Sequence, residues 1–433
     1  MDRSVTALTV SGPVSGTIDA IASKSHVHRL LMAAALSDSP TVIRCRTTSA
    51  DIEATRNVLA ALGATFRVTP GAIEVMPVRE LVRESTLDCS ESGTTLRFML
   101  PIVAALGSNS SFMAHGRLPS RPLSPLYEEL ERHGIRLSAQ GAVPLDVRGK
   151  LSCGDYTIAA NVSSQFVGGL LFALSLLEGK STLTLTETIE SLPYTVMTLE
   201  VLKLFGARIS ASEDMRRFEI EGASRLRSPG TVVAEGDWSN AAFWLCAGAL
   251  GGGCRVGNLN LDSVQGDKAV LRILSAFGAK VTCKDGLVKV TSDTLKATRI
   301  DARHIPDLVP VLAVVAGAAC GTTVFENIQR LRIKESDRVE TTIALLRSLG
   351  VNAASDETTL TVKGRGGFLS GEISGFNDHR IVMAAAVASL NTPEGMTITA
   401  PTAVNKSYPQ FFEDWQGMGG RVVVLSQEKK GKK

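Results

Sequence analysis

A pattern of apolar and polar residues recurs six times along the chain. Each copy has an amphipathic helix that ends near a glycine and a short apolar strand that follows it, as in ELERHGIRLS and LSAFGAKVT. Glycine is favoured just past a helix end, because the chain there takes a left-handed conformation that a Cβ disfavours. The six glycines are spaced 71, 72, 72, 72 and 69 residues apart, at Gly63, Gly134, Gly206, Gly278, Gly350 and Gly419. Chance recurrence does not produce such even spacing, so the pattern predicts six repeats.

A second helix is expected in each repeat, with a polar start and a body of small apolar residues. These segments span residues 23–36, 92–106, 163–177, 237–250, 304–318 and 377–390. Bodies rich in alanine, glycine and leucine are typical of helices that are buried on all sides. The sequence therefore predicts an α/β fold of six units, each with two helices and several short strands.

The composition fits a globular protein of more than one domain. The chain has 433 residues, of which 44% are apolar and 21% charged, and this length is large for a single core. The longest apolar runs, such as Leu308–Cys320, are shorter than the roughly 20 residues that span a bilayer, and the N-terminus lacks an apolar signal core. The seven cysteines are scattered without a CxxC motif, which indicates neither a disulfide framework nor a zinc site. We therefore expect a cytoplasmic protein.

The net charge of +3 is concentrated at the C-terminus, where KKGKK holds four lysines. We expect residues 428–433 to form a disordered, solvated tail. The rest of the chain shows no basic stripe, and aromatic residues make up only 5%. This is not typical of a nucleic-acid-binding protein, so we expect neither a nucleic-acid nor a membrane partner.

Polar and charged residues gather at the predicted starts of the helices. Helix N-termini carry unpaired N–H groups and a partial positive charge, so they suit phosphate and carboxylate ligands. Together with the lysines and arginines near them, they predict a small ligand with several negative charges. A single serine at such a position is more often a helix cap. Only the accumulation at equivalent places in the repeats favours a binding site.

Nine short motifs at these positions resemble those of the EPSP synthase (5-enolpyruvylshikimate-3-phosphate synthase) family, in the same order and at compatible spacing. They are SKSHVHR at 23–29, ESGTTLR at 91–97, SRP at 120–122, SSQF at 163–166, SLPY at 191–194, IPD at 305–307, RIKESDR at 332–338, NDHR at 377–380 and NKSYP at 405–409. The resemblance covers nearly the whole chain. It implies two globular domains, each built of three β-α-β-α-β-β repeats, with crossings of the chain near Ala20 and Glu235. The first domain would comprise residues 1–19 and 236–433, and the second residues 20–235.

The family reaction adds the hydroxyl of shikimate 3-phosphate to phosphoenolpyruvate and then eliminates phosphate from a tetrahedral intermediate. Such chemistry needs a base, a proton donor and cations around the substrate anions. The resemblance implies that Asp307 removes the hydroxyl proton, that Glu335 is the acid, and that Lys24 lies between the two substrates. Taken without the family, Asp307 is more often a helix cap and Glu335 an i,i+3 ion-pair partner of Arg338. We expect a monomer that acts on small anionic substrates without a cofactor, and the six dispersed histidines do not indicate a metal site.

The same resemblance assigns the binding residues. Those for shikimate 3-phosphate are Lys24, Ser25, Arg29, Ser163, Ser164, Gln165, Ser191, Tyr194, Asp307 and Lys334. Those for phosphoenolpyruvate are Lys24, Gly93, Thr94, Arg121, Gln165, Arg338, Arg380 and Lys406. Arginine makes two parallel contacts to a carboxylate, which suits Arg338 and Arg380. Glycine lets the backbone approach an oxygen closely, which suits Gly93.

Two alternatives stay open at this point. The sister enolpyruvyl transferase that acts on UDP-N-acetylglucosamine has the same architecture, but it carries a catalytic cysteine on the loop before its Arg-Pro. Here that loop reads AHGRLPSRP, without a cysteine. A non-catalytic anion-binding protein would not need Asp307, Glu335 and Lys24 together.

The chain departs from many members of the family at three positions. Glu91, Phe98 and Arg330 stand where many members have asparagine, proline and asparagine. These changes affect the fine geometry expected of both substrate sites. They leave open the response to glyphosate, which competes with phosphoenolpyruvate in this family.

Overall fold

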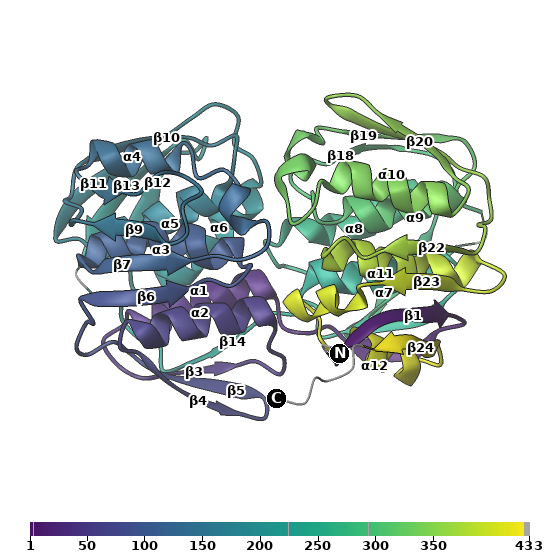
Figure 1. Ribbon diagram of the computed structural model, residues 1–433, viewed down its shortest axis with the longest axis horizontal. Coiled ribbons are helices and arrows are strands. Elements are labelled where there is room, and N and C mark those ends of the chain that lie inside the picture. Colours follow the sequence, from purple (N-terminus) through teal and green to yellow (C-terminus); the bar gives the residue numbers. More distant parts are fainter. Residues whose placement is uncertain (3, 224, 293, 428–433) are drawn as a thin grey trace. The chain divides into compact units, whose positions relative to one another are not determined.

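The computed structural model describes residues 1–2, 4–223, 225–292 and 294–427; the predicted tail at 428–433 lies outside these ranges. The chain forms two compact units. Unit 1 comprises Met1–Ile21 with Glu235–Lys433, and unit 2 comprises Ala22–Ala234. Figure 1 shows that, in each unit, strands surround a group of helices.

The described residues form six four-stranded sheets that share one topology. In each sheet the first two strands are parallel, and the other neighbours are antiparallel. The sheets of unit 2 have the strand orders β14(Thr231–Val233)-β3(Thr41–Arg44)-β5(Ala72–Met76)-β4(Thr65–Thr69), β6(Glu84–Asp88)-β7(Asn109–Met113)-β9(Leu145–Arg148)-β8(Arg136–Leu137) and β10(Asp155–Ala159)-β11(Gly179–Thr186)-β13(Arg217–Gly222)-β12(Arg208–Ala211). The sheets of unit 1 have the orders β2(Ser15–Asp19)-β15(Gly253–Gly257)-β17(Leu287–Thr291)-β16(Lys280–Lys284), β18(Arg299–Asp301)-β19(Thr322–Glu326)-β21(Thr359–Lys363)-β20(Asn352–Ser355) and β22(Gly371–Ser374)-β23(Met396–Thr399)-β1(Val5–Ser11)-β24(Arg421–Gln427).

Each repeat contributes one deeply buried helix and one helix with an exposed face. The buried helices are α1(Lys24–Ala35), α3(Gly93–Leu106), α5(Ser164–Ser175), α7(Trp238–Ala249), α9(Val309–Ala318) and α11(His379–Ala388). The others are α2(Ala50–Ala61), α4(Leu126–Arg132), α6(Leu192–Leu204), α8(Val270–Ala276), α10(Arg338–Ser348) and α12(Phe411–Gly417). Short 3₁₀ turns are η1(Leu118–Ser120), η2(Gly266–Ala269), η3(Gln329–Ile333), η4(Ser389–Asn391) and η5(Pro401–Lys406). None of the described helices combines the length and the apolar character needed to cross a bilayer.

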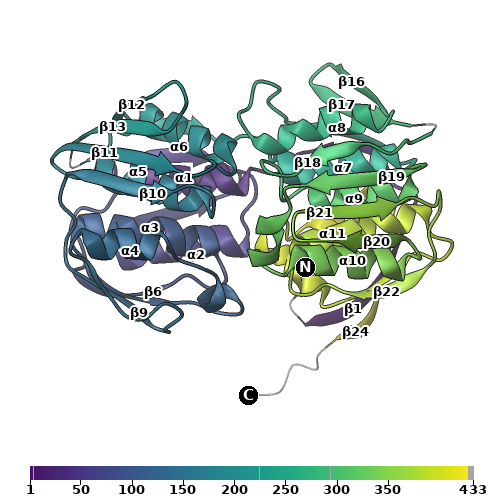
Figure 2. The same ribbon diagram turned by 90° about the horizontal axis from the view of Figure 1, so that it is seen from above.

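The helices and sheets enclose a separate apolar core in each unit, and Figure 2 shows the helices inside the sheets. Strands such as β10 and β13 alternate between exposed and buried residues, so one face of each covers the core. Helices α3 and α5 pack closely. A Cβ at Gly169 would lie 2.7 Å from the carbonyl oxygen of Arg97, a separation that no larger residue permits. The close packing of α3 against α5 thus explains why these buried helices contain small residues.

The six repeat glycines confirm the predicted helix ends. Each lies two residues after the last residue of its helix, and all have positive φ. The values are 111° at Gly63, 85° at Gly134, 77° at Gly206, 92° at Gly278, 73° at Gly350 and 95° at Gly419. This is the left-handed conformation in which glycine avoids the cost of a Cβ.

Strands β2 and β14 each pair within one unit, whereas the helix that follows each of them belongs to the other unit. Strand β2 directly precedes α1, yet it pairs with β15 of unit 1. Strand β14 directly precedes α7, yet it pairs with β3 of unit 2. Strand β1 likewise completes the sheet of the last repeat, between β23 and β24. All six repeats therefore have complete sheets, although three of the sheets take one strand from a distant part of the chain.

Candidate active site

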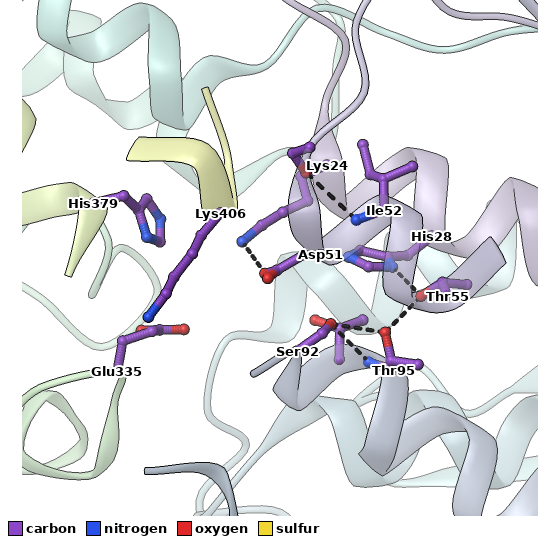
Figure 3. A network of polar contacts seen from close by, with 12 residues as sticks. Lys24, His28, Asp51, Ile52, Thr55, Ser92, Thr95, Glu335, His379 and Lys406 are labelled. Carbon is purple, nitrogen blue, oxygen red and sulfur yellow. Dashed lines mark hydrogen bonds and ion pairs between the residues drawn. The ribbon is translucent and has the colours of Figure 1, made fainter. Parts of the chain in front are cut away.

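Lys24 begins α1, and two polar contacts join this helix to α2 in unit 2. Lys24 Nζ lies 2.7 Å from Asp51 Oδ2, and His28 Nδ1 lies 2.7 Å from Thr55 Oγ1 (Figure 3). The two contacts are one helical turn apart on both helices, at i and i+4, so they lie on one face of each. The ammonium group of Lys24 is thus held near the N-terminal ends of both helices.

A buried chain of hydrogen bonds continues from His28 to the start of α3. Thr55 Oγ1 lies 2.6 Å from Thr95 Oγ1, and the Thr95 hydroxyl donates to Ser92 Oγ over 2.7 Å (Figure 3). Ser92 caps α3, because its Oγ also accepts from the Thr95 backbone N–H over 3.2 Å. Burial, with two nearby cationic side chains, lowers the pKa of His28 well below its ordinary value, so the ring is neutral at physiological pH. This chain fixes the first turn of α3 against α1 and α2.

Arg29 is buried and joins α1 to α6. Its Nε donates to Thr198 Oγ1 over 2.8 Å, its NH1 to the carbonyl of Ser25 over 2.7 Å, and its NH2 to the carbonyl of Tyr194 over 3.0 Å. The guanidinium lies 4.9 Å from the ring centre of Phe98 on α3. Burial lowers the pKa of Arg29 to about 10, so the group stays charged. Three residues predicted to bind shikimate 3-phosphate, Ser25, Arg29 and Tyr194, therefore meet.

The starts of α3 and α5 meet through Gln165. Its amide nitrogen donates to Thr94 Oγ1 over 2.8 Å, and its amide oxygen accepts from Arg97 over 3.0 Å. Arg121 follows η1 and lies against Gly93, where a Cβ would be 2.8 Å from its NH1. The absence of a side chain at Gly93 thus lets the guanidinium lie across the first turn of α3. Four residues predicted to bind phosphoenolpyruvate form one group.

Three of the four predicted serines lie at the starts of α5 and α6. The Ser163 hydroxyl accepts from the backbone N–H of Gln165 over 3.2 Å, which is the capping role that serine most often has there. Ser164 is the first residue of α5. Ser191 precedes α6 with a φ of 53°, a conformation that non-glycine residues seldom adopt and that concentrates at functional sites. The serines thus accompany two helix N-termini, which favour anions.

In unit 1, Asp307 lies among three cationic side chains. Its Oδ1 is 2.5 Å from Arg338 NH1 and 3.6 Å from Lys334 Nζ, and its Oδ2 is 3.7 Å from Arg380 NH2. Asp307 precedes α9, Lys334 directly follows η3, Arg338 begins α10, and Arg380 is in the first turn of α11. Three helix starts therefore bring together four residues that the sequence predicted to act together.

Arg338 lies at the centre of this cluster. Its Nε donates to Asp378 Oδ2 over 2.8 Å, and its NH2 donates to Glu335 Oε2 over 2.7 Å and to Asp378 Oδ1 over 3.3 Å. Burial opposes the charge of Arg338, but the carboxylates around it raise its pKa well above the ordinary value. The contact between Glu335 and Arg338 is the i,i+3 ion pair considered from the sequence. Most N–H groups of Arg338 donate to carboxylates of the same unit.

Asp307 and Lys334 have shifted pKa values. Burial disfavours a charge on Asp307, but Lys334, Arg338 and Arg380 hold the pKa of Asp307 well below its ordinary value. Burial lowers the pKa of Lys334 to about 8; Arg330 and Arg338 add to this effect, and Asp307 opposes it. At neutral pH, Asp307 is thus a carboxylate, and Lys334 is a cation that loses its proton just above physiological pH.

Arg380 and Lys406 complete the predicted set in unit 1. Arg380 is 3% exposed, yet its Nε and NH1 have no hydrogen-bond partner among the described residues. Its guanidinium lies 5.8 Å from the ring centre of Phe243. Lys406 donates to the carbonyl of Asn377 over 2.6 Å, and its side chain points toward Glu335 (Figure 3). A buried arginine with unused N–H groups is suited to a carboxylate ligand.

Two acidic residues of these clusters were not predicted from the sequence. Asp51 holds Lys24 from a position 27 residues away. Asp267 is buried in η2, accepts from the hydroxyl of Ser239 on α7, 28 residues away, and interacts electrostatically with Asp307. Neither lies in a motif at the start of a buried helix. Only their position in the fold identifies them.

The carboxylates of these clusters are not arranged as metal ligands. Within the described ranges, no group of three or more His, Cys, Asp or Glu side chains could hold a metal ion. Those of unit 1 are paired with arginine and lysine instead, as around Arg338. An anionic ligand can take the place of one of these carboxylates beside an arginine or lysine. Such clusters are therefore suited to bind anions.

The chain is similar to known proteins over nearly its whole length. The family model of EPSP synthase (3-phosphoshikimate 1-carboxyvinyltransferase) matches residues 8–415. The relatives include a 3-phosphoshikimate 1-carboxyvinyltransferase of Clostridium kluyveri, 37% identical, with 94% of this chain and 96% of the relative covered. One of Clostridium acetobutylicum is 38% identical, with the same coverage of 94% and 96%.

Solved structures share the fold. An EPSP synthase from Acinetobacter baumannii superposes with a TM-score of 0.78 at 23% identity, covering 96% of this chain and 99% of that one. The enolpyruvyl transferase NikO from Streptomyces tendae superposes with a TM-score of 0.75 at 18% identity, covering 97% and 99%. At these identities the likeness establishes the two-domain α/β architecture alone.

Proposed function

The chain belongs to the EPSP synthase family, and we propose that it transfers the enolpyruvyl group of phosphoenolpyruvate to the 5-hydroxyl of shikimate 3-phosphate, with release of phosphate. The observation that carries this proposal is the family match over residues 8–415, which includes all the clustered residues of both units. We also propose that units 1 and 2 are the two domains of the enzyme. The assigned residues belong to both units.

Asp307 is assigned as the acceptor of the hydroxyl proton. Its low pKa keeps it ionised but makes it a weak base, because base strength falls with pKa. The acceptor hydroxyl must therefore become more acidic when it binds. Lys334, whose Nζ is 3.6 Å from Asp307 Oδ1, is suited to stabilise the developing oxyanion. Glu335, with Lys24, is assigned to protonate the methylene carbon of phosphoenolpyruvate.

The carboxylate of phosphoenolpyruvate is assigned first to Arg380. The unused N–H groups of this buried side chain support the assignment, whereas Arg338 already contacts Asp307, Glu335 and Asp378. The phosphate of phosphoenolpyruvate is assigned to Lys406 and to the start of α3, where Gly93, Thr94, Arg121 and Gln165 form one group. Shikimate 3-phosphate is assigned to Ser25, Arg29, Ser163, Ser164, Ser191 and Tyr194.

We propose a monomer in the cytoplasm that acts on small-molecule substrates. Cys153, Cys283 and Cys320 are free, exposed thiols, which suits a reducing compartment.

Phosphate release tests the reaction. The purified protein should release phosphate from phosphoenolpyruvate when shikimate 3-phosphate is added, and not with UDP-N-acetylglucosamine or without an acceptor. Binding of both substrates without phosphate release would favour an anion-binding protein, and release with the nucleotide sugar alone would favour the sister transferase.

The pKa of Lys334 predicts a pH dependence of substrate binding. Its pKa of about 8 means that the ammonium charge is present below pH 8 and lost above it, while the phosphate of the substrate is already fully ionised. The KM for shikimate 3-phosphate should therefore rise above pH 8, by up to about tenfold per pH unit if the charge is essential. In Lys334→Arg, the charge persists, and the KM should stay flat from pH 7 to 9. A wild-type KM that is equally flat would contradict the assignment.

A further inference from the structure

A chain of three hydroxyl groups joins the ring of His28 to the start of α3 (Figure 3). His28 Nδ1 lies 2.7 Å from Thr55 Oγ1, Thr55 Oγ1 lies 2.6 Å from Thr95 Oγ1, and the Thr95 hydroxyl donates to Ser92 Oγ over 2.7 Å. All four side chains are fully buried. Each hydroxyl group has a single hydrogen, so the direction of one bond determines the directions of the others.

These bonds determine which nitrogen of His28 carries the hydrogen. The Thr95 hydroxyl gives its hydrogen to Ser92, so it must accept from Thr55, and Thr55 in turn must accept from His28 Nδ1. The ring is neutral, because burial and two nearby cationic side chains lower its pKa well below the ordinary value. It therefore has one N–H, at Nδ1. Its Nε2 is buried without a partner among the described residues, which agrees, because a buried N–H without an acceptor is rare.

Ser92 ends this chain and is also the cap of α3. Its Oγ accepts from the hydroxyl of Thr95 over 2.7 Å and from the backbone N–H of Thr95 over 3.2 Å. Both lone pairs of the oxygen are thus directed at the first turn of the helix, so its own hydrogen points away from that turn, beyond the helix end. Among the described residues, Ser92 Oγ donates to no acceptor. A buried donor without an acceptor costs free energy, so a ligand that accepts this hydrogen is favoured.

The surroundings of this hydrogen favour an anion. The first turn of α3 contains no acidic residue, and the N-terminus of a helix carries a partial positive charge. The guanidinium of Arg121 lies across the same turn, where a Cβ at Gly93 would be 2.8 Å from its NH1. A hydroxyl donor, a helix N-terminus and a guanidinium group thus favour the same kind of ligand. The phosphate of phosphoenolpyruvate is the anion assigned to this place.

We propose that Ser92 is a further ligand of the phosphate of phosphoenolpyruvate, and that His28 is a positioning residue that keeps the Ser92 hydroxyl turned toward it. Because His28 donates to Thr55, every hydroxyl of the chain donates in the direction of α3. The hydrogen of Ser92 is then unable to turn back toward Thr95 and stays available to the ligand. This inference rests on the proposed function, because it takes the substrate phosphate as the acceptor.

Two variants of Ser92 test the ligand. Ser92→Ala loses one hydrogen bond to a charged group, so the KM for phosphoenolpyruvate, at saturating shikimate 3-phosphate, should rise by about 10- to 100-fold. Ser92→Gly should show the same rise, because glycine caps a helix nearly as well as serine but has no hydroxyl. Ser175→Ala removes a buried hydroxyl that donates to the carbonyl of Leu171 within α5, and it should keep the wild-type KM. A wild-type KM in Ser92→Gly would overturn the assignment of the ligand.

Two variants of nearly equal shape test the positioning by His28. Asparagine offers an N–H close to the place of Nδ1, whereas leucine offers none. His28→Leu should raise the KM for phosphoenolpyruvate by about three- to tenfold with little change in kcat, and His28→Asn should stay close to the wild type. If the ring served packing alone, the apolar leucine would be the better replacement in this buried place. A KM that rises more in His28→Asn than in His28→Leu would therefore overturn the role of His28.

The tautomer of His28 gives a test that needs no turnover. Nitrogen NMR of the histidine rings in the unliganded protein distinguishes a hydrogen on Nδ1 from a hydrogen on Nε2, and the signals that are missing in His28→Asn belong to His28. We expect the hydrogen on Nδ1. A hydrogen on Nε2 would mean that the chain runs in the opposite direction, which would overturn the inference. A wild-type protein that has the expected tautomer but releases no phosphate would contradict the proposed function instead.

Discussion

Asp307→Ala is expected to lower kcat by about 10²–10⁴-fold while the KM for shikimate 3-phosphate changes much less. The reason is that the variant loses the group assigned to accept the hydroxyl proton, whereas the serines and Arg29 assigned to bind the substrate lie on other elements. Steady-state kinetics with each substrate varied in turn would measure the effect. Glu335→Ala should also lower kcat more than binding.

Two companion variants make this result specific. Asp307→Ala removes both the shape of the side chain and the carboxylate that Lys334, Arg338 and Arg380 share. Asp307→Asn keeps the shape and removes only the carboxylate, so it should give a comparable loss of kcat. Asp301→Asn changes an exposed aspartate at the end of β18, and it should keep the wild-type rate. If Asp307→Asn turns over at a near-normal rate, Asp307 only positions the cations. If Glu335→Ala does so, Lys24 becomes the better proton donor.

The repeated architecture could be predicted because its signals are local. A glycine such as Gly206 marks a helix end through its own backbone conformation, with a φ of 77°. A helix such as α7 is recognisable because all twelve of its residues are buried, so its sequence carries no polar face. Both signals need only the residues of one segment, and the period between them then predicts the number of units.

The pairing of strands at the crossings could not be predicted from such signals. Strand β2 pairs with β15, so Ser15 lies opposite Gly253, more than two hundred residues later in the chain. Strand β14 pairs with β3 at a similar distance. Hydrophobic alternation predicts that a strand exists but not which strand it adjoins, because many short strands have equivalent patterns.

Many charged residues of these clusters could be named from the sequence, but the geometry of the clusters could not. The motif RIKESDR contains the i,i+3 spacing that brings Glu335 to Arg338. The stronger contacts of Arg338 come from Asp378, 40 residues away, and Asp307, 31 residues away. Sequence analysis could therefore name Arg338 as a candidate ligand-binding residue, yet it could not show that the fold already occupies most of its N–H groups. Asp51 and Asp267 escaped for the same reason.

Arg338→Ala is therefore expected to unfold unit 1 more readily as well as to weaken phosphoenolpyruvate binding. Removing one partner of a buried ion pair leaves uncompensated charge, which typically costs about 3–5 kcal/mol. Here the side chain is 1% exposed, and its partner Asp378 is fully buried. The free energy of unfolding, measured by denaturant titration, should fall by about this amount.

Two other arginines separate stability from binding. Arg332 pairs with Asp337 and Glu340, but its side chain is 33% exposed, so Arg332→Ala should cost less than about 1 kcal/mol. Arg380 is as buried as Arg338, but its Nε and NH1 are unpaired among the described residues; Arg380→Ala should therefore destabilise less than Arg338→Ala and raise the KM for phosphoenolpyruvate more. An Arg338→Ala protein as stable as Arg332→Ala would mean that the carboxylate cluster does not depend on Arg338. The fold would then hold Asp307, Glu335 and Asp378 in place by backbone packing alone, and Arg338 would be retained for the substrate.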